Sequence, residues 1–259
     1  MKRLIGLLFA LVATAAMATP PGHFEERAAK IEGVDYRYQV FVPGGLSPSS
    51  HPPIVLFLHG SGEKGEDNKA QMSQGLPPWL KEHLDFPAVV VMPQAHPQQS
   101  WRHNTVASAA LAILRTSMAE FHADPKQVYV TGLSDGGFGA WKLGAEHPGE
   151  FAGLVIICGG VFSTWDGQAY TAIWGAPAHD GPQALFDWVA GKVKGTPVWL
   201  FHGADDGTVP PEQSRQMHAA LERIGSPVRY TEYPGVGHGS WQKAYATPNL
   251  WPFYHPPQL

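Results

Sequence analysis

Residues 127–137 read QVYVTGLSDGG, an apolar run that ends in a serine flanked by glycines. The run 128–130 is followed by the pattern G-x-S-x-G at 132–136, and a helix-like stretch then continues to near Pro148. A strand that turns sharply into a helix needs small residues at the turn, and it lifts the central serine above the sheet edge. Because the bare pattern is common by chance, its position between strand and helix is what makes Ser134 a candidate nucleophile.

Short apolar runs alternate with helical patterns along most of the chain. Val34–Val42 alternates apolar and polar residues, which predicts an edge or hairpin strand at the entry to the fold. Helical spacing of apolar residues predicts helices over 105–122 and 217–224, the second ending at Gly225. Continuous apolar strands separated by helices are typical of an α/β fold with a mainly parallel central sheet flanked by helices. The other predicted strands are Ile54–Leu58, Pro87–Met92, Gln127–Thr131, Leu154–Cys158, Val198–Phe201 and Val228–Tyr233.

Residues 161–195 interrupt this alternation before the strand Val198–Phe201. They are rich in Gly, Pro and aromatic residues, and a simple crossover needs far fewer residues. We predict a short insertion here, acting as a lid or substrate-binding segment over the carboxyl edge of the sheet, where open α/β folds bind ligands. A helical crossover with a long loop is the alternative.

The first 18 residues differ from the rest of the chain. Lys2 and Arg3 precede the apolar stretch Leu4–Ala16, and small residues follow where an export peptidase cuts. The stretch is too short to span a bilayer, which needs about 20 residues. We therefore expect residues 1–18 to be a signal peptide, residues 19–259 to form a single domain, and the protein to be exported, either periplasmic or secreted.

Composition argues against several other classes of protein. The formal net charge is −4 and there is no basic run, so a nucleic-acid partner is not expected. No second hydrophobic segment approaches spanning length, so we expect no membrane contact after removal of residues 1–18, and a monomer. Cys158 is the single cysteine; it cannot form an internal disulfide, and its apolar surroundings predict a buried core residue.

A serine nucleophile needs a histidine base and a carboxylate that orients it. The sequence HGADDGTVP follows one strand at 202–210, and PGVGHG follows the next at 234–239. Neighbouring parallel strands end at the same sheet edge, so we expect Ser134, His238 and either Asp205 or Asp206 to converge. His202 and Asp206 are four residues apart, but no third type of ligand clusters with them, so neither a metal nor a cofactor is expected.

Two further groups are predicted at the site. The backbone N–H of Asp135 and that of Ser61, or alternatively Gly62, are candidates for binding an oxyanion, since Ser61 follows the strand Ile54–Leu58. His59 precedes these glycines, which favours a role in shaping the loop. Among the aromatic residues we nominate Trp101 and Trp165 as substrate contacts, although core packing explains tryptophans equally well.

From about residue 30 to 246 the chain resembles secreted esterases of the α/β-hydrolase superfamily. The resemblance is to the branch of feruloyl and acetylxylan esterases, polyhydroxybutyrate depolymerase-like proteins and prolyl-oligopeptidase-related predicted peptidases. The matching stretches are LFLHGSGEKGEDN at 56–68, VMPQ at 91–94, DP at 124–125, VYVTGLSDGG at 128–137 and GHGSW at 237–241.

This resemblance implies the α/β-hydrolase fold with Ser134, Asp206 and His238 as its triad. Asp206 is chosen over Asp205 because it occupies the acid position of the motif H-G-x-x-D-x-x-V-P. The implied function is hydrolysis of a carboxylic ester, small or derived from a polymer, without a cofactor. A serine peptidase acting on short peptides is one alternative, and a non-catalytic protein that binds a glycan or apolar ligand is another. Asp135 is unusual after the nucleophile, and its carboxylate is expected to point away from the oxyanion.

Overall fold

The computed structural model describes residues 19–47, 49–163, 171–172 and 181–252, and within them an eight-stranded sheet carries the fold. Six neighbouring strands, from β4 to β10, run parallel. The predicted α/β-hydrolase fold is confirmed by this sheet. In spatial order the strands are β1 (His23–Ile31), β2 (Val34–Val42), β4 (Val89–Pro93), β3 (Ile54–Leu58), β5 (Val128–Leu133), β6 (Gly153–Ile157), β9 (Val198–Gly203) and β10 (Val228–Tyr233).

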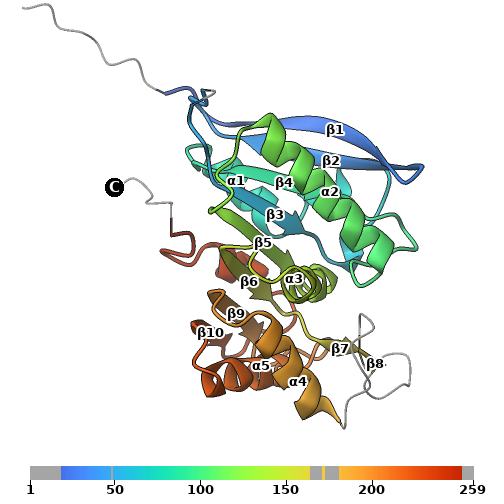
Figure 1. The fold of residues 1–259 in the computed structure, drawn as a ribbon, viewed down its shortest axis with the longest axis vertical. Helices are drawn as coiled ribbons and strands as arrows, with labels where there is room; N and C mark the ends of the chain where they lie inside the picture. Colours follow the sequence, from blue (N-terminus) through green and yellow to red (C-terminus); the bar gives the residue numbers. More distant parts are fainter. Residues whose placement is uncertain (1–18, 48, 164–170, 173–180, 253–259) are drawn as a thin grey trace, which may run out of the picture.

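A hairpin closes one edge of this sheet (Figure 1). Strand β2 pairs antiparallel with both β1 and β4, so β1 forms the outermost strand. Strand β2 was predicted as an edge or hairpin strand, and it is the inner strand of that hairpin.

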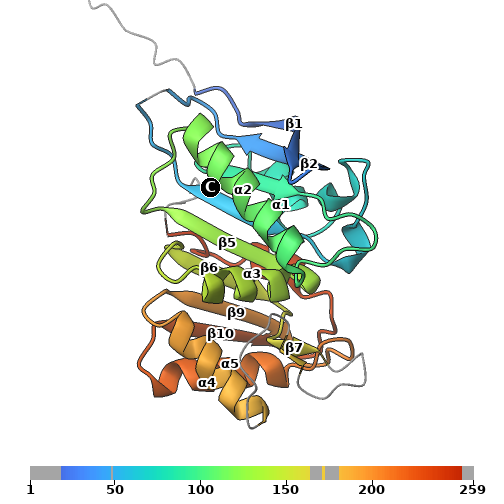
Figure 2. The ribbon, with the colours of Figure 1, turned by 45° about the vertical axis from the view of Figure 1, so that its right-hand side comes forward.

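Helices cover both faces of the sheet and divide the core in two. Figure 2 shows α2, α3, α4 and α5 on one face, where they enclose one apolar cluster with side chains such as Ile54 and Leu56. Residues Val55 and Phe57 of the same strand point to the other face, where α1 and α6 pack. This alternation is the period-two pattern of a strand buried on both sides. The helices are α1 (Leu76–Glu82), α2 (Asn104–Glu120), α3 (Asp135–Glu146), α4 (Pro182–Lys192), α5 (Glu212–Arg223) and α6 (Trp241–Tyr245).

The structure divides the interval 161–195 into two parts. Residues 181–195 contain α4, which contacts α3 and α5 and so acts as an ordinary crossover helix. Earlier in the interval, β7 (Phe162–Ser163) and β8 (Thr171–Ala172) pair antiparallel in a small separate sheet. Residues 164–170 and 173–180 lie outside the described residues. A lid or substrate-binding role for this segment stays a prediction.

The predicted signal peptide, residues 1–18, also lies outside the described residues. Within the described part of the chain, every helix is too short or too polar to cross a membrane.

Candidate active site

Ser134 sits on a strained turn between β5 and α3. Its φ of 52° and ψ of −118° lie where non-glycine residues are rarely found. The turn is possible because its glycines admit close backbone approach: a Cβ on Gly132 would lie 2.1 Å from Gly136 O, and one on Gly136 would lie 1.9 Å from Leu58 O. The strain lifts the Ser134 side chain above the sheet edge, as the sequence pattern predicts.

Three side chains meet at this edge although they are far apart in sequence. Ser134 Oγ lies 2.9 Å from His238 Nε2, and His238 Nδ1 lies 2.7 Å from Asp206 Oδ2. A carboxylate can only accept, so Nδ1 carries the ring proton and the lone pair of Nε2 faces the serine. The resulting chain of hydrogen bonds is the arrangement by which a histidine takes the proton of a serine hydroxyl. Asp205, the competing carboxylate, forms no side-chain hydrogen bond or ion pair with the described residues.

The Asp206 carboxylate is buried and surrounded by donors. Burial alone would raise its pKa, but hydrogen bonds from His202, His238 and the backbone N–H groups of Val209 and Thr208 hold that pKa well below its usual range. The backbone donors reach Oδ1 at 2.8 Å from Thr208 and 2.9 Å from Val209. Asp206 therefore stays ionised at any pH near neutrality, as the orientation of His238 requires.

The loop after β3 lies beside the serine. A Cβ on Gly60 would lie 3.6 Å from Ser134 Cβ. Ser61 opens the short 3-10 helix η1 (Ser61–Glu63) and Asp135 opens α3, so neither backbone N–H has an acceptor within its own helix. Backbone N–H groups without an acceptor in their own helix can bind an oxyanion, so those of Ser61 and Asp135 remain candidates for this role.

His59 shapes this loop from within the core. The Ala95 N–H donates to its Nε2 at 3.0 Å, so its proton lies on Nδ1, which donates to Gly60 O at 2.6 Å. Burial lowers the pKa of His59 to about 4, and this keeps the ring neutral and the hydrogen bonds in place.

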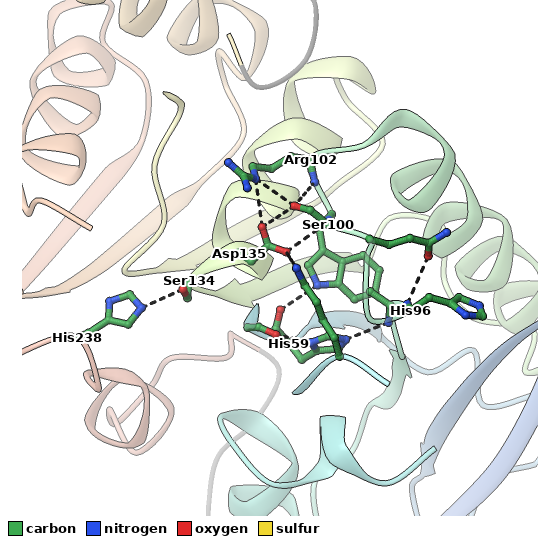
Figure 3. Close-up of polar contacts among 12 residues, drawn as sticks. His59, His96, Ser100, Arg102, Ser134, Asp135 and His238 are labelled. Atoms are coloured by element: carbon green, nitrogen blue, oxygen red, sulfur yellow. Dashed lines mark hydrogen bonds and ion pairs between the residues drawn. The ribbon is translucent and has the colours of Figure 1, made fainter. Parts of the chain in front are cut away.

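The Asp135 side chain belongs to a separate polar network. Figure 3 shows its carboxylate turned towards Ser100 and Arg102 and away from Ser134. It accepts from Ser100 Oγ at 2.6 Å, and Arg102 Nε and Lys64 Nζ lie 3.2 and 3.7 Å away. These contacts tie the N-terminus of α3 to two loops, and the two cations oppose the charge that Asp135 brings near the serine.

One predicted substrate contact requires correction and another cannot be placed. Trp101 is fully buried, its Nε1 donates to His59 O at 2.8 Å, and its ring packs edge-on to that of His59. It supports the loop from the core side and has no surface to offer a substrate. Trp165 lies outside the described residues. Trp241, by contrast, packs edge-on to the His238 ring and donates from Nε1 to Gln74.

Cys158 lies beside the triad. Among the described residues, its sulfur and one ligand atom each of Asp206 and His238 lie within 4.8 Å of one another. The close hydrogen bond between His238 and Asp206 already engages two of these groups. Burial raises the pKa of the Cys158 thiol far above its usual range, which disfavours the thiolate that a metal would need.

The sequence did not predict that a second imidazole, that of His202, lies beside the Asp206 carboxylate. His202 was considered only as a metal ligand, yet its Nε2 lies 3.2 Å from Asp206 Oδ2. The signal was present, since His202 begins the same H-G-x-x-D motif that identifies Asp206. The partners of Asp135 carried no such signal, because Ser100 lies 35 residues away in sequence.

The sheet and the serine turn define the class as an α/β hydrolase. Residues 98–253, more than half of the chain, match the prolyl oligopeptidase family. The chain belongs to that family.

The chain is also similar to solved structures and to curated relatives. A thermostable esterase superposes with a TM-score of 0.68 at 33% identity, covering 86% of this chain and 60% of that one. The acylaminoacyl peptidase of Pyrococcus horikoshii shares the fold, with a TM-score of 0.66 at 16% identity over 85% of this chain and 38% of the peptidase. Poly(3-hydroxyalkanoate) depolymerase C of Paucimonas lemoignei is 27% identical over 190 residues, which are 68% of this chain and 45% of the depolymerase. The chain thus spans less than half the length of the peptidase and of the depolymerase, and 60% of the esterase.

Proposed function

We propose that this protein hydrolyses carboxylic esters through an acyl intermediate on Ser134. The observation that carries the proposal is the unbroken hydrogen-bond chain from Ser134 through His238 to Asp206. The serine follows a strained strand–helix turn, and the backbone N–H groups of Ser61 and Asp135, each at the start of a helix, are the candidates for the oxyanion donors that acyl transfer also needs.

Each residue has one role in the proposed reaction. Ser134 Oγ attacks the ester carbonyl while His238 Nε2 takes its proton, and Asp206 stabilises the imidazolium that forms. The N–H groups of Ser61 and Asp135 bind the carbonyl oxygen as it becomes negative. The C–O bond to the alcohol then breaks and His238 returns the proton to the leaving alkoxide. Water repeats the sequence on the acyl group and frees Ser134.

Relatives favour an ester over an amide. Esterases and a polyester depolymerase are among the proteins that the chain resembles, including the thermostable esterase at 33% identity. The alcohol and the acyl group are not specified by these names. A polymer-derived ester fits the depolymerase, and a small ester fits the esterases.

The Ser134→Ala variant tests the proposal. It removes the nucleophile but leaves the backbone and the other two side chains, so turnover of p-nitrophenyl acetate should fall by several orders of magnitude at unchanged Tm. A fluorophosphonate should label Ser134 in the unchanged protein, as located by mass spectrometry, and should not label the variant. Activity of the variant near that of the unchanged protein would rule out the mechanism.

A serine peptidase is the second candidate, because the chain belongs to the prolyl oligopeptidase family. The same triad cleaves either bond, so the comparison must be made on matched substrates. Esters and anilides of the same acetyl and short peptidyl groups would decide: efficient ester turnover with negligible anilide cleavage supports the esterase, and the reverse supports the peptidase. Failure of both, together with absence of fluorophosphonate labelling, would favour a binding protein.

We also propose that the protein is exported, as the pattern of residues 1–18 indicates. A relative from Arthroderma benhamiae, 26% identical over 208 residues, is described as a secreted protein. Whether the destination is the periplasm or the medium, and whether the exported form is a monomer, are separate questions for fractionation and gel filtration.

A further inference from the structure

The Asp206 carboxylate has four donors, one more than a triad and an acid loop supply. Oδ1 accepts from the backbone of Thr208 and Val209 at 2.8 and 2.9 Å. Oδ2 accepts from His238 Nδ1 at 2.7 Å, and His202 Nε2 lies 3.2 Å from the same oxygen. The side chains of His202 and Asp206 are both 0% exposed, so this pair is fully removed from water.

The contacts of His202 fix where its proton lies. Its Nε2 is 2.9 Å from Val209 O, a carbonyl that can only accept, so Nε2 must carry a hydrogen. The same nitrogen lies 3.2 Å from Asp206 Oδ2, within hydrogen-bond distance of that oxygen. Its Nδ1 is 2.7 Å from Ser214 Oγ on α5, whose hydroxyl can donate to the ring. A neutral His202 with its proton on Nε2 therefore has a partner on both nitrogens.

We propose that His202 is a positioning residue for the triad, whose Nε2–H holds Asp206 Oδ2 in line with His238. The inference rests on the proposed function, since it assigns His202 a task in the same proton transfer. Without His202, Oδ2 would keep a single partner, His238 itself, and the carboxylate could rotate about the oxygen that the backbone holds.

The two imidazoles approach the same carboxylate oxygen. His238 Nδ1 and His202 Nε2 lie 2.7 and 3.2 Å from Asp206 Oδ2, so this oxygen is held by a donor besides the base that it orients. Removing the His202 donor should leave the orientation of the His238 ring less defined. Other titratable or charged groups near His202 are Glu232 on β10, which Arg215 of α5 engages, and Cys158 at the end of β6.

A pair of variants separates positioning from packing. In His202→Gln the amide nitrogen reaches the place of Nε2, whereas in His202→Asn it falls short, at the place of Nδ1. We expect His202→Asn to lower kcat on p-nitrophenyl acetate about tenfold, with KM little changed. His202→Gln should recover most of the lost kcat, because its amide nitrogen restores the donor to Asp206 Oδ2. His218→Asn on α5 serves as the control, outside the site.

The outcomes are distinct. An equal kcat in His202→Asn and in the unchanged protein would overturn the proposal. So would a loss of kcat in His202→Gln as large as in His202→Asn, because that pattern marks packing alone. If His202→Asn does not fold, the ¹⁵N shifts of the unchanged protein decide, since a proton on Nδ1 instead of Nε2 contradicts the proposal. The NMR measurements need no turnover, so failure of the proposed esterase activity would appear separately, in the assays with the unchanged protein.

Discussion

His59 shows at the level of one residue how burial fixes a protonation state that the site depends on. Its ring is fully buried, and burial lowers its pKa from 6.5 to about 4. A protonated His59 would lose its role as acceptor for the Ala95 N–H and disturb the loop that carries Ser61. The charge of the His59 side chain therefore affects the loop that carries Ser61, because His59 donates a hydrogen bond to Gly60 O in that loop.

This lowered pKa has a consequence for stability. Between pH 6.5 and 4 the unfolded chain takes up a proton at His59 that the folded protein does not, so the free energy of unfolding falls as the pH falls. The stabilisation that comes from keeping His59 neutral is fully present above about pH 6.5. By pH 4 about 3 kcal/mol of the free energy of unfolding is lost. Urea unfolding at pH 7, 5.5 and 4.5 should show this slope, and His59→Asn should flatten it.

Asp206 provides a check on that window. Its pKa is lowered, so its own stabilisation is lost only as the pH falls below about 4, the value of an unfolded aspartate. A slope between pH 4.5 and 6.5 that is the same in the unchanged protein and in His59→Asn would contradict the role given to His59.

At the scale of elements, the turn between β5 and α3 forms only because its glycines have no side chain, which lets the backbone pass close to neighbouring strands. Gly136→Ala should displace this turn, because its Cβ would lie 1.9 Å from Leu58 O. We expect a loss of fluorophosphonate labelling at Ser134 together with a lower Tm. Gly191→Ala is the matched control: it lies in α4, where the new Cβ would have no described atom beyond its own stretch of helix backbone within 4 Å, and it should stabilise the protein by roughly 0.5–1 kcal/mol. Normal labelling in Gly136→Ala would show that the turn tolerates a side chain.

The sequence predicted all six parallel strands of the sheet, to within two residues at each end. Strands β3 and β10 have the predicted bounds, and Gly225 has the expected positive φ, 64°, just after α5. Strand β1 escaped prediction because none of its nine residues is fully buried, so it shows no apolar run. Helix α4 corresponds to the helical crossover that the sequence left as an alternative for 161–195, because the glycines, prolines and aromatics around it resemble a loop in composition.

The site divides in the same way. Ser134 and His238 could be nominated because parallel strands end at one edge, which turns spacing along the chain into proximity. Choosing Asp206 over Asp205 required a resemblance, since both follow the same strand. The place of Trp101 in the core and the contact of His202 with Asp206 depend on packing between distant elements, which no local pattern records.

For the whole molecule, the candidate site exists only when the sheet is complete. Its parts follow β3, β5, β9 and β10, and the hydrogen bond between Ser134 and His238 joins residues 104 apart in sequence. Contacts of such separation form late, because the intervening chain must first be ordered. Labelling of Ser134 is therefore a test of global folding as well as of chemistry.

Export is the prediction that belongs to this scale. Expressed from residue 1 in a Gram-negative host, the protein should appear outside the cytoplasm with Thr19 as its first residue, by mass spectrometry of the purified protein. A chain expressed from residue 19 with an added Met serves as the comparison and should stay in the cytoplasm. Recovery of the longer chain from the cytoplasm with residues 1–18 still attached would contradict the prediction.

The single cysteine makes spontaneous opening of the site measurable. Cys158 is fully buried beside Asp206 and His238, and its raised pKa keeps it a thiol. Alkylating reagents attack the exposed thiolate, so the folded protein should resist iodoacetamide. Modification must then wait for β6 and the loops above it to separate. The alkylation rate under native conditions therefore reports how often the region beneath the triad opens, and no probe has to be introduced. The change in this rate after phosphonylation of Ser134 reports how far an acyl-like group holds that region closed.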